Sequence, residues 1–322
     1  MPGIKDIAQK AGVSITTVSN VLNGKQNVGS KTKENILRIA KELNYTHPND
    51  KALSRGNGKT IVFHFSDFDT LYYHDILHGI SDYAYSKGYD ILVSSDIKFK
   101  RYSNSCGCIV LDDRLSDREL IKLAGSSYPV VTLDREIPGE GIKSIVVNNY
   151  ASEKQLTERL ADAGFKRFAY LGGPDTADNR ERFKAFKEVL DKRGIHFKRM
   201  DYYDGNWQEE SGVQAARLIL LSEKMPEVLV CANDMMALGA IRRFHEDGVR
   251  IPEDIAVCGF DDIIISRYVR LTTVTVPNYE RGYIAAQALI ELIEGRGDYE
   301  TVHIGARVKW RESTGKALVK GK

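Results

Sequence analysis

From Thr60 onward, short apolar runs alternate with longer amphipathic segments along most of the chain. This alternation is typical of α/β folds, in which crossover helices join parallel strands. Nine apolar runs are expected to form strands, namely Ile61–Phe65, Asp90–Val93, Cys108–Leu111, Val130–Leu133, Ile145–Val147, Phe168–Leu171, Val228–Cys231, Ile255–Cys258 and Thr273–Val276. Helices are expected over Tyr73–Lys87, Ala151–Ala163, Arg180–Lys192, Trp207–Leu221, Met235–Glu246 and Gly282–Glu294. The sequence therefore predicts a doubly wound α/β body.

Composition excludes several other classes of protein. The chain has 322 residues, 42% of them hydrophobic, which suits a well-filled core spread over about two domains. No apolar run approaches 18 residues, and the first ten residues, MPGIKDIAQK, carry charge where a signal peptide needs an apolar stretch. Four scattered cysteines do not make a disulfide scaffold. We therefore expect a cytoplasmic protein without a membrane segment.

Charge is distributed unevenly along the chain. Residues 1–55 hold nine Lys and Arg but only four Asp and Glu, a net charge of about +5. The remaining residues carry 37 basic and 40 acidic side chains, a net charge of about −3. A small basic segment beside a large, slightly acidic body suits contact with a polyanion, but a solvated basic surface would give the same charge distribution, so charge alone leaves both open.

The basic segment has the pattern of three short helices. Apolar residues recur at helical spacing between Ile4 and Ala11, and Gly12 would end that helix. Ser14 is placed to cap a second helix over Ile15–Leu22, and a third helix is expected over residues 31–43. Two short helices joined by a sharp glycine turn predict a helix-turn-helix.

The runs IKDIAQKAGVSITTVSNVLNG and VGSKTKENILRIAKELNY resemble the headpiece of the lactose-repressor (LacI/GalR) family of transcription factors. In that fold the second helix enters the major groove of DNA with its N-terminal residues at the base edges. By position, the resemblance implies DNA-binding roles for Ser14, Ile15, Thr16, Thr17, Ser19, Asn20, Asn23 and Thr32.

Three of these positions would read bases, namely Ile15, Thr16 and Asn20. Asn20 stands where the family frequently has arginine. Arginine pairs with guanine, whereas asparagine suits the N6 and N7 atoms of adenine, so we expect adenine at the matching half-site position. The short hydroxyl and amide side chains at the other positions suit phosphate contacts.

Residues 48–59 resemble the family's hinge, a short helix that begins at Pro-Asn and inserts a leucine into the minor groove. Pro48 and Asn49 match its start, but Leu53 follows the proline two positions sooner than the family pattern expects. Two interpretations stay open: a hinge helix with Leu53 as the wedge, or a flexible linker, which Gly56 and Gly58 would suit.

The body resembles the effector-binding core of the same family, which is itself similar to periplasmic sugar-binding proteins. The matching segments are LDR (133–135), YLGGP (170–174), RFKAF (182–186), CANDMMALGA (231–240), IPEDIAVCGFDD (251–262), LTTV (271–274) and WREST (310–314). By position, the resemblance implies effector-binding roles for Tyr72, Tyr73, Asp134, Arg182, Trp207, Asn233 and Asp261. Carboxylate, amide and guanidinium groups can each bind two vicinal hydroxyls, and a flat aromatic ring can cover a sugar face. Asp134 and Asp261 also follow apolar strands directly, where ligands of open α/β sheets bind.

The resemblance implies a headpiece over residues 1–47, a linker over 48–59 and a two-lobed core over 60–322. Lobe one would comprise about 60–148 and 279–305, and lobe two 149–278 and 306–322. The stretch between Ser94 and Cys108 is too short for the family's full crossover helix. Repressors similar to the evolved-β-galactosidase repressor are trimmed in the same way, and this resemblance favours a galactoside effector.

The implied function is that of a homodimeric transcriptional repressor, which binds a pseudo-palindromic DNA operator and responds to a small sugar. We expect neither cofactor nor metal, and His64, His74 and His78 are expected at the surface or cleft rim. Two alternatives stay open. One is a sugar-modifying enzyme with a DNA-binding head, for which Asp134 and Asp261 are the only candidate acid/base pair. The other is a regulator controlled by a co-repressor or a protein partner.

Overall fold

The computed structural model describes residues 4–22, 29–43, 59–68, 70–96, 101–102 and 104–317. The chain divides into two compact units, Met1–Lys59 and Thr60–Lys322, which we call the head and the body. None of the helices among the described residues has the length and apolarity needed to cross a membrane.

The head contains three helices, α1 (Ile4–Ala11), α2 (Ile15–Leu22) and α3 (Ser30–Glu42). They surround one apolar core, made of Ile7, Ala8, Val18, Val21, Ile36, Ile39 and Ala40. Gly12 has a φ of +66°, a conformation that favours glycine, and it makes the turn between α1 and α2. The Ser14 hydroxyl accepts a hydrogen bond from the Thr17 amide at 3.0 Å and thereby caps α2, as the sequence predicts.

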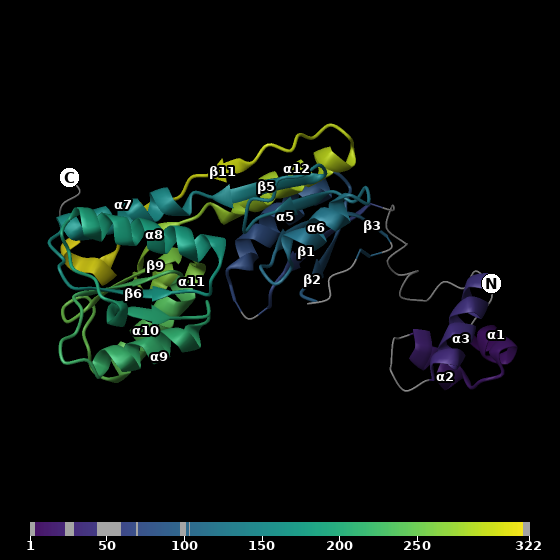
Figure 1. The fold of residues 1–322 in the computed structure, drawn as a ribbon, viewed down its shortest axis with the longest axis horizontal. Coiled ribbons are helices and arrows are strands. Elements are labelled where there is room, and N and C mark those ends of the chain that lie inside the picture. Colours follow the sequence, from purple (N-terminus) through teal and green to yellow (C-terminus); the bar gives the residue numbers. More distant parts are fainter. Residues whose placement is uncertain are drawn as a thin grey trace. The chain divides into compact units, whose positions relative to one another are not determined.

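The first lobe of the body is built on a parallel sheet with the strand order β11-β5-β4-β3-β1-β2. Figure 1 labels β1, β2, β3, β5 and β11 of this sheet. Its strands are β1 (Thr60–Phe65), β2 (Asp90–Ser94), β3 (Ser105–Leu111), β4 (Val130–Thr132), β5 (Ile142–Val147) and β11 (Val302–Ile304). Its helices are α5 (Tyr73–Ser86), α6 (Asp117–Ala124) and α12 (Asn278–Ile293). Alternate residues of β1 enter different cores, because Phe63 packs towards α5 and α12 while Val62 packs towards α6. Burial on both faces is the reason these strands read as continuous apolar runs.

The second lobe has a sheet with the order β12-β10-β9-β8-β6-β7, in which only β12 is antiparallel to its neighbour. Its strands are β6 (Phe168–Gly172), β7 (Tyr202–Asp204), β8 (Val228–Cys231), β9 (Ala256–Asp261), β10 (Thr272–Thr275) and β12 (Arg307–Lys309). Its helices are α7 (Asn149–Asp162), α8 (Ala177–Lys192), α9 (Glu209–Leu220), α10 (Asp234–Glu246) and the short α11 (Ile264–Tyr268). Two 3-10 helices, Arg199–Asp201 and Glu312–Ala317, complete it.

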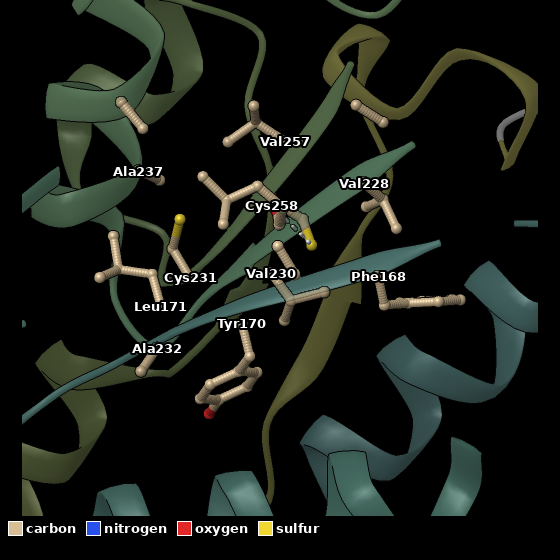
Figure 2. Close-up of a cluster of buried hydrophobic side chains, with 14 of the residues drawn as sticks. Phe168, Tyr170, Leu171, Val228, Val230, Cys231, Ala232, Ala237, Val257 and Cys258 are labelled. Atoms are coloured by element: carbon tan, nitrogen blue, oxygen red, sulfur yellow. Dashed lines mark hydrogen bonds between the residues drawn. The ribbon is translucent and has the colours of Figure 1, made fainter. Parts of the chain in front are cut away.

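The central strands β6, β8 and β9 form the core of the second lobe (Figure 2). Phe168 and Tyr170 of β6 lie beside Val228 and Val230 of β8, and all four side chains are buried. Cys231 and Cys258 are free thiols within this core, and burial raises the pKa of both. These cysteines therefore fill apolar space and are not reactive groups.

The predicted α/β class, with a helix-turn-helix head and a two-lobed body, is confirmed. All nine predicted strands exist, but helix starts were less accurate. Helices predicted from Arg180 and Gly282 begin at Ala177 and Asn278, because the apolar periodicity that predicted them starts later than the helices do. The sequence did not predict α6, α11, β7, β11 and β12, nor the two 3-10 helices. The trimmed segment, residues 95–104, joins β2 to β3 across β1, and part of it lies outside the described residues.

Candidate functional site

The carboxyl ends of strands from both sheets of the body open onto one cleft. Asp112 follows β3, Asp134 follows β4, Asn233 follows β8, and Asp261 ends β9. All four line a cavity of about 480 Å³ that both lobes contribute to. This volume lies in the range of small-molecule sites, and the position is the one that ligands of open α/β sheets occupy.

The structure brings together all seven residues that the sequence analysis assigned to an effector. The cavity is lined by Tyr72, Tyr73, Asp134, Arg182, Trp207, Asn233 and Asp261, among others. They come from both lobes and are separated by up to 189 positions in the chain, from Tyr72 to Asp261. Their roles towards a ligand stay predictions, since the cavity geometry alone does not assign them.

Tyr72 and Tyr73 stand at the start of α5 and form one wall of the cleft. The Tyr72 hydroxyl accepts a hydrogen bond from Nη1 of Arg281 at 2.8 Å, and Arg281 also donates to the carbonyl of Leu133. The Tyr73 hydroxyl lies 2.5 Å from the Ser66 hydroxyl, and its ring stacks on Phe65 with centroids 4.6 Å apart. Both rings are thus held rigidly from the first lobe.

Arg182 is a buried cation on α8, only 4% exposed. Its Nε donates to Oδ1 of Asn149 at 2.9 Å, and its Nη1 donates to the carbonyl of Ala232. The guanidinium lies 3.6 Å from the ring centroid of Phe260, in cation–π geometry. Its Nη2 makes no hydrogen bond with the described residues, so this group retains donors for a ligand in the cleft.

A hydrogen bond joins the Asn233 side chain to the backbone of Trp207 in the second lobe. The Asn233 side chain caps α10 by accepting from the Met236 amide at 2.9 Å, and it donates to the Trp207 carbonyl at 2.8 Å. Trp207 has a φ of +71° and lies in the loop before α9, with its indole so close to Gly173 that a Cβ there would come within 2.4 Å. A glycine is therefore needed at position 173 for the indole to line the cleft.

Asp134 and Asp261 face the cleft with free oxygen atoms. Oδ2 of Asp134 accepts from Nη1 of Arg135, whereas its Oδ1 is buried and has no partner among the described residues. Burial raises the pKa of Asp134 to about 7, which Arg135 opposes. Asp261 is 7% exposed and has a strained φ of +114°; burial raises its pKa as well, against the effect of Arg182.

Further polar residues of the cleft were not predicted. Asp112 accepts from Nε2 of His64 at 2.9 Å if that nitrogen carries the proton, and from Nε of Arg114 at 2.8 Å; the pKa of Asp112 falls as a result. The expectation that His64 lies at the surface or cleft rim is wrong, because its strand β1 is buried on both faces and the His64 side chain is fully buried. Asp112 follows an apolar strand as Asp134 does, so the same signal could have found it. Asp178 and Arg281 gave no such signal, since only the tertiary fold brings them near the cleft.

On the head, the predicted DNA-binding residues lie on and beside α2. Ser14, Ile15 and Thr16 are exposed at its N-terminus, and Ile15 is 46% exposed although it is apolar. Thr17, Ser19 and Asn20 are half-buried, as is Thr32 in the first turn of α3. Asn23, Leu53 and most of the linker lie outside the described residues. The geometry leaves the N-terminal end of α2 accessible.

Two family models match the chain. Residues 3–49 match the bacterial regulatory proteins of the lacI family, and residues 157–314 match the periplasmic binding protein-like domain. The chain is 31% identical to the probable HTH-type transcriptional repressor ExuR of Bacillus subtilis, over 91% of this chain and 92% of that protein. The chain belongs to the lacI family of bacterial regulatory proteins. It is thus a DNA-binding transcriptional repressor, and its relatives are repressors and not enzymes.

Other members of the lacI family are similar over most of their length. The repressor PurR of Mannheimia succiniciproducens is 29% identical over 98% of this chain and 99% of its own. A solved sugar-binding regulator of the lacI family from Enterococcus faecalis is 28% identical, with a TM-score of 0.73, over 79% of this chain and 97% of its own. A lac repressor dimer solved with operator and the anti-inducer ONPF is 25% identical, with a TM-score of 0.69, over 97% of this chain and 99% of its own.

Proposed function

We propose that this protein is a homodimeric repressor of carbohydrate-utilisation genes, and that a small sugar bound in the cleft of the body releases it from a pseudo-palindromic operator. Residues 1–47 would bind DNA, and the two lobes of residues 60–322 would bind the sugar. Residues 48–59 would link these two parts of the chain. Galactosides are the first sugars to examine, because of the trimmed segment before β3. The proposed place of action is the cytoplasm, where operator DNA lies.

The head supports the DNA-binding part of this proposal. The Ser14 cap and the packed core hold α2 as a rigid helix, and Ile15 and Thr16 are exposed at its N-terminal end. Ile15 is apolar yet 46% exposed, and its side chain could contact a thymine methyl group in the major groove. Asn20, on the same helix, would read adenine.

The cleft supports the sugar-binding part. Trp207 presents an indole ring for the apolar face of a sugar, and Arg182, Asp134 and Asp261 retain free donors and acceptors. The observation that carries the proposal is this convergence of seven residues, each singled out by position in the sequence, on one cavity between the lobes. A sugar that contacts both lobes would favour one lobe arrangement over another, which is the differential binding that a ligand switch needs.

The body also offers a surface for a second copy of the chain. Around α11 four apolar side chains are exposed by 39 to 80%, namely Ile264, Ile265, Tyr268 and Val269. Contiguous exposed apolar residues mark interaction surfaces, and the solved lac repressor relative is a dimer. We propose that this segment contributes to the homodimer, because one small head makes too few phosphate contacts for tight binding on its own.

The direct experiment has two steps. The full chain is first used to select an operator from random duplexes and from promoter fragments near its own gene. A panel of mono- and disaccharides is then screened for a rise in thermal stability, and each hit is tested for release of the selected operator. Release supports the proposal. A sugar that tightens operator binding would instead indicate a co-repressor, and failure to select any duplex at low ionic strength would contradict the proposal outright.

A further inference from the structure

The cleft is strongly acidic for a site proposed to bind a sugar. Its lining includes eight aspartates, namely Asp67, Asp112, Asp113, Asp117, Asp134, Asp175, Asp178 and Asp261. The cations that line it are three arginines, Arg135, Arg180 and Arg182, and the lining has no lysine, glutamate or histidine among the described residues. Two more arginines do not line the cavity but donate hydrogen bonds to residues that do: Arg114 to Asp112, and Arg281 to Tyr72. Even with all five counted, the carboxylates outnumber the cations.

Arg135 and Arg281 use most of their hydrogen-bond donors in contacts within the protein. Arg135 donates from Nε to Asp117, from Nη1 to Asp134 and from Nη2 to the carbonyl of Leu115. Arg281 donates to the Tyr72 hydroxyl and to the carbonyl of Leu133. Apart from Nη2 of Arg182 and the exposed Arg180, the cleft therefore offers few arginine donors to a ligand that carries only acceptors.

The acceptors, in contrast, are left open. Asp261 is 93% buried, since it is 7% exposed, and its carboxylate makes no hydrogen bond with the described residues although it lines the cavity. Oδ1 of Asp134 is buried without a partner among them. Asp178, which accepts from Asn149 at 2.7 Å, is close enough to act electrostatically on both other carboxylates. Three carboxylates from the ends of β4 and β9 and the start of α8 thus face one space.

We propose that the effector is an amino sugar, whose ammonium group binds among Asp134, Asp178 and Asp261 while Trp207 covers a face of the ring. This inference rests on the proposed sugar effector and adds its charge class. An ammonium group offers three donors and a positive charge, which match the open acceptors. Among the described residues no three carboxylate, His or Cys side chains converge tightly enough for a metal ion. An ammonium group does not need that convergence, because it can donate to one or two of the carboxylates while its charge acts on the third.

Sugars that carry a carboxylate are expected to be rejected. Like charges brought together at a partly buried site repel each other, and the free Nη2 of Arg182 compensates only in part, because eight aspartates line the same cavity. Burial raises the pKa of Asp134 and of Asp261, so the empty cleft already disfavours additional negative charge. A bound ammonium group relieves the repulsion among these three carboxylates, and a hydroxyl does so only weakly.

The test compares three sugars that share one ring configuration. The full chain is titrated calorimetrically at pH 7 with the 2-amino sugar, the neutral parent and the uronate of the galacto, gluco and manno series. In a series that binds, we expect the amino sugar to bind about tenfold more tightly than the parent, and the uronate about tenfold more weakly, a difference of about 1.4 kcal/mol for each step.

A variant pair separates the proposed contact from the general charge of the cleft. Asp178→Asn keeps a side chain able to accept from Asn149, and it should abolish most of the preference for the amino sugar while neutral sugars still bind. Asp175→Asn is the matched control, because Asp175 lines the same cleft but is 87% exposed and is paired with Arg180 at 2.7 Å. This control should retain the preference.

The outcomes are distinguishable from those of the proposed function. A neutral parent that binds as tightly as its amino sugar, or a uronate that binds as tightly as the parent, overturns this inference and leaves a sugar-responsive repressor. An unchanged preference in Asp178→Asn overturns it too. If no member of any series binds, the proposed sugar effector is contradicted, and this inference falls with it.

Discussion

The guanidinium of Arg281, 1% exposed, donates to the hydroxyl of Tyr72 across 2.8 Å. This contact joins α12 to the wall of the cleft at the start of α5, and the same guanidinium reaches the end of β4 through the carbonyl of Leu133. A change in the position of Tyr72 on ligand binding would therefore alter its contact with α12, the helix through which the chain returns from the second lobe to the first.

Tyr72→Phe should destabilise the body. The substitution removes an acceptor and leaves a buried cationic N–H without a partner, which costs about 1–3 kcal/mol. Urea unfolding followed by circular dichroism measures the change. Tyr279→Phe is the control, because the Tyr279 hydroxyl donates to Asp82 at 2.8 Å in an exposed contact. Equal effects of the two substitutions would argue against a special role for the buried contact.

Arg182→Ala should abolish the response to the effector and leave operator affinity unchanged. The substitution removes the free Nη2 donor from the cleft, at a site remote in sequence from the DNA-binding head. Thermal shift with the effector and operator binding without it are the two measurements. Arg180→Ala is the matched control, since Arg180 lines the cleft but is 61% exposed. A normal effector response of Arg182→Ala would refute the assignment of the cleft.

Asn20→Arg should change the operator that is selected. Wild type is expected to prefer adenine at the half-site position read by residue 20, and arginine there should prefer guanine through its O6 and N7 atoms. A bidentate pair provides about 1–3 kcal/mol of discrimination, so selection from random duplexes will reveal the change. Guanine at that position in the wild-type selection would contradict the base-reading role of Asn20.

Glu153→Gln should alter the pH dependence of stability. Glu153 on α7 is fully buried, its Oε1 accepts from Thr157 at 2.9 Å, and its Oε2 has no partner among the described residues. Burial raises its pKa from 4.5 to about 7, opposed by Thr157 and Arg182. The folded state therefore holds a proton that the unfolded state loses, so this group destabilises the protein as pH rises from about 4.5 to about 7.

In Glu153→Gln the side chain is uncharged at every pH, so the variant does not lose this stability as the pH rises. Between pH 4.5 and 8 its free energy of unfolding should improve relative to wild type by up to about 3 kcal/mol, at 1.36 kcal/mol for each pH unit that the pKa is raised. The measurement is urea unfolding at several pH values. Glu158→Gln is the control on the same helix, because Glu158 is 42% exposed and pairs with Lys154. Parallel pH curves for Glu153→Gln and wild type would contradict the prediction.

Tyr268→Glu should weaken the proposed dimer. Tyr268 is 80% exposed beside three other exposed apolar residues of α11 and the turn after it, and a charge there would oppose burial against a second copy. Sedimentation velocity should show a larger monomer fraction, together with weaker operator binding. Leu221→Glu is the control, since Leu221 is 83% exposed at the end of α9. A Tyr268→Glu protein that remains dimeric would exclude this surface.

How far the sequence predicts the site depends on the kind of signal. The family resemblance predicts cleft roles for Asp134 and Asp261, and their position directly after apolar strands supports the same prediction from a local pattern. Asp112 gives the same local signal, but it lies outside the segments that carry the family resemblance. Asp178 and Arg281 sit on helices whose sequence shows only a polar or charged residue in the first turn. Their closeness to the cleft depends on how α8 and α12 pack, which no local pattern encodes.

The elements that were missed or misplaced have identifiable causes. Helix α6 is short, but the hydroxyl of Ser116 accepts from the Glu119 amide and the Glu119 carboxylate accepts from the Ser116 amide, a capping box that is readable in the sequence. Thr176 caps α8 in a similar way, so helix starts are better predicted from capping residues than from apolar periodicity. The strands β11 and β12 have three residues each, too few to show any period.

The central claim is that the cleft and the head are thermodynamically coupled, and reciprocal titration tests it most directly. The affinity of the effector is measured with and without operator, and the affinity of operator with and without effector, on the same full chain. Linkage requires the two ratios to be equal, and we expect each to lie between about 5 and 150 and to vanish in Arg182→Ala. An effector that binds wild type equally well with and without operator would contradict the account.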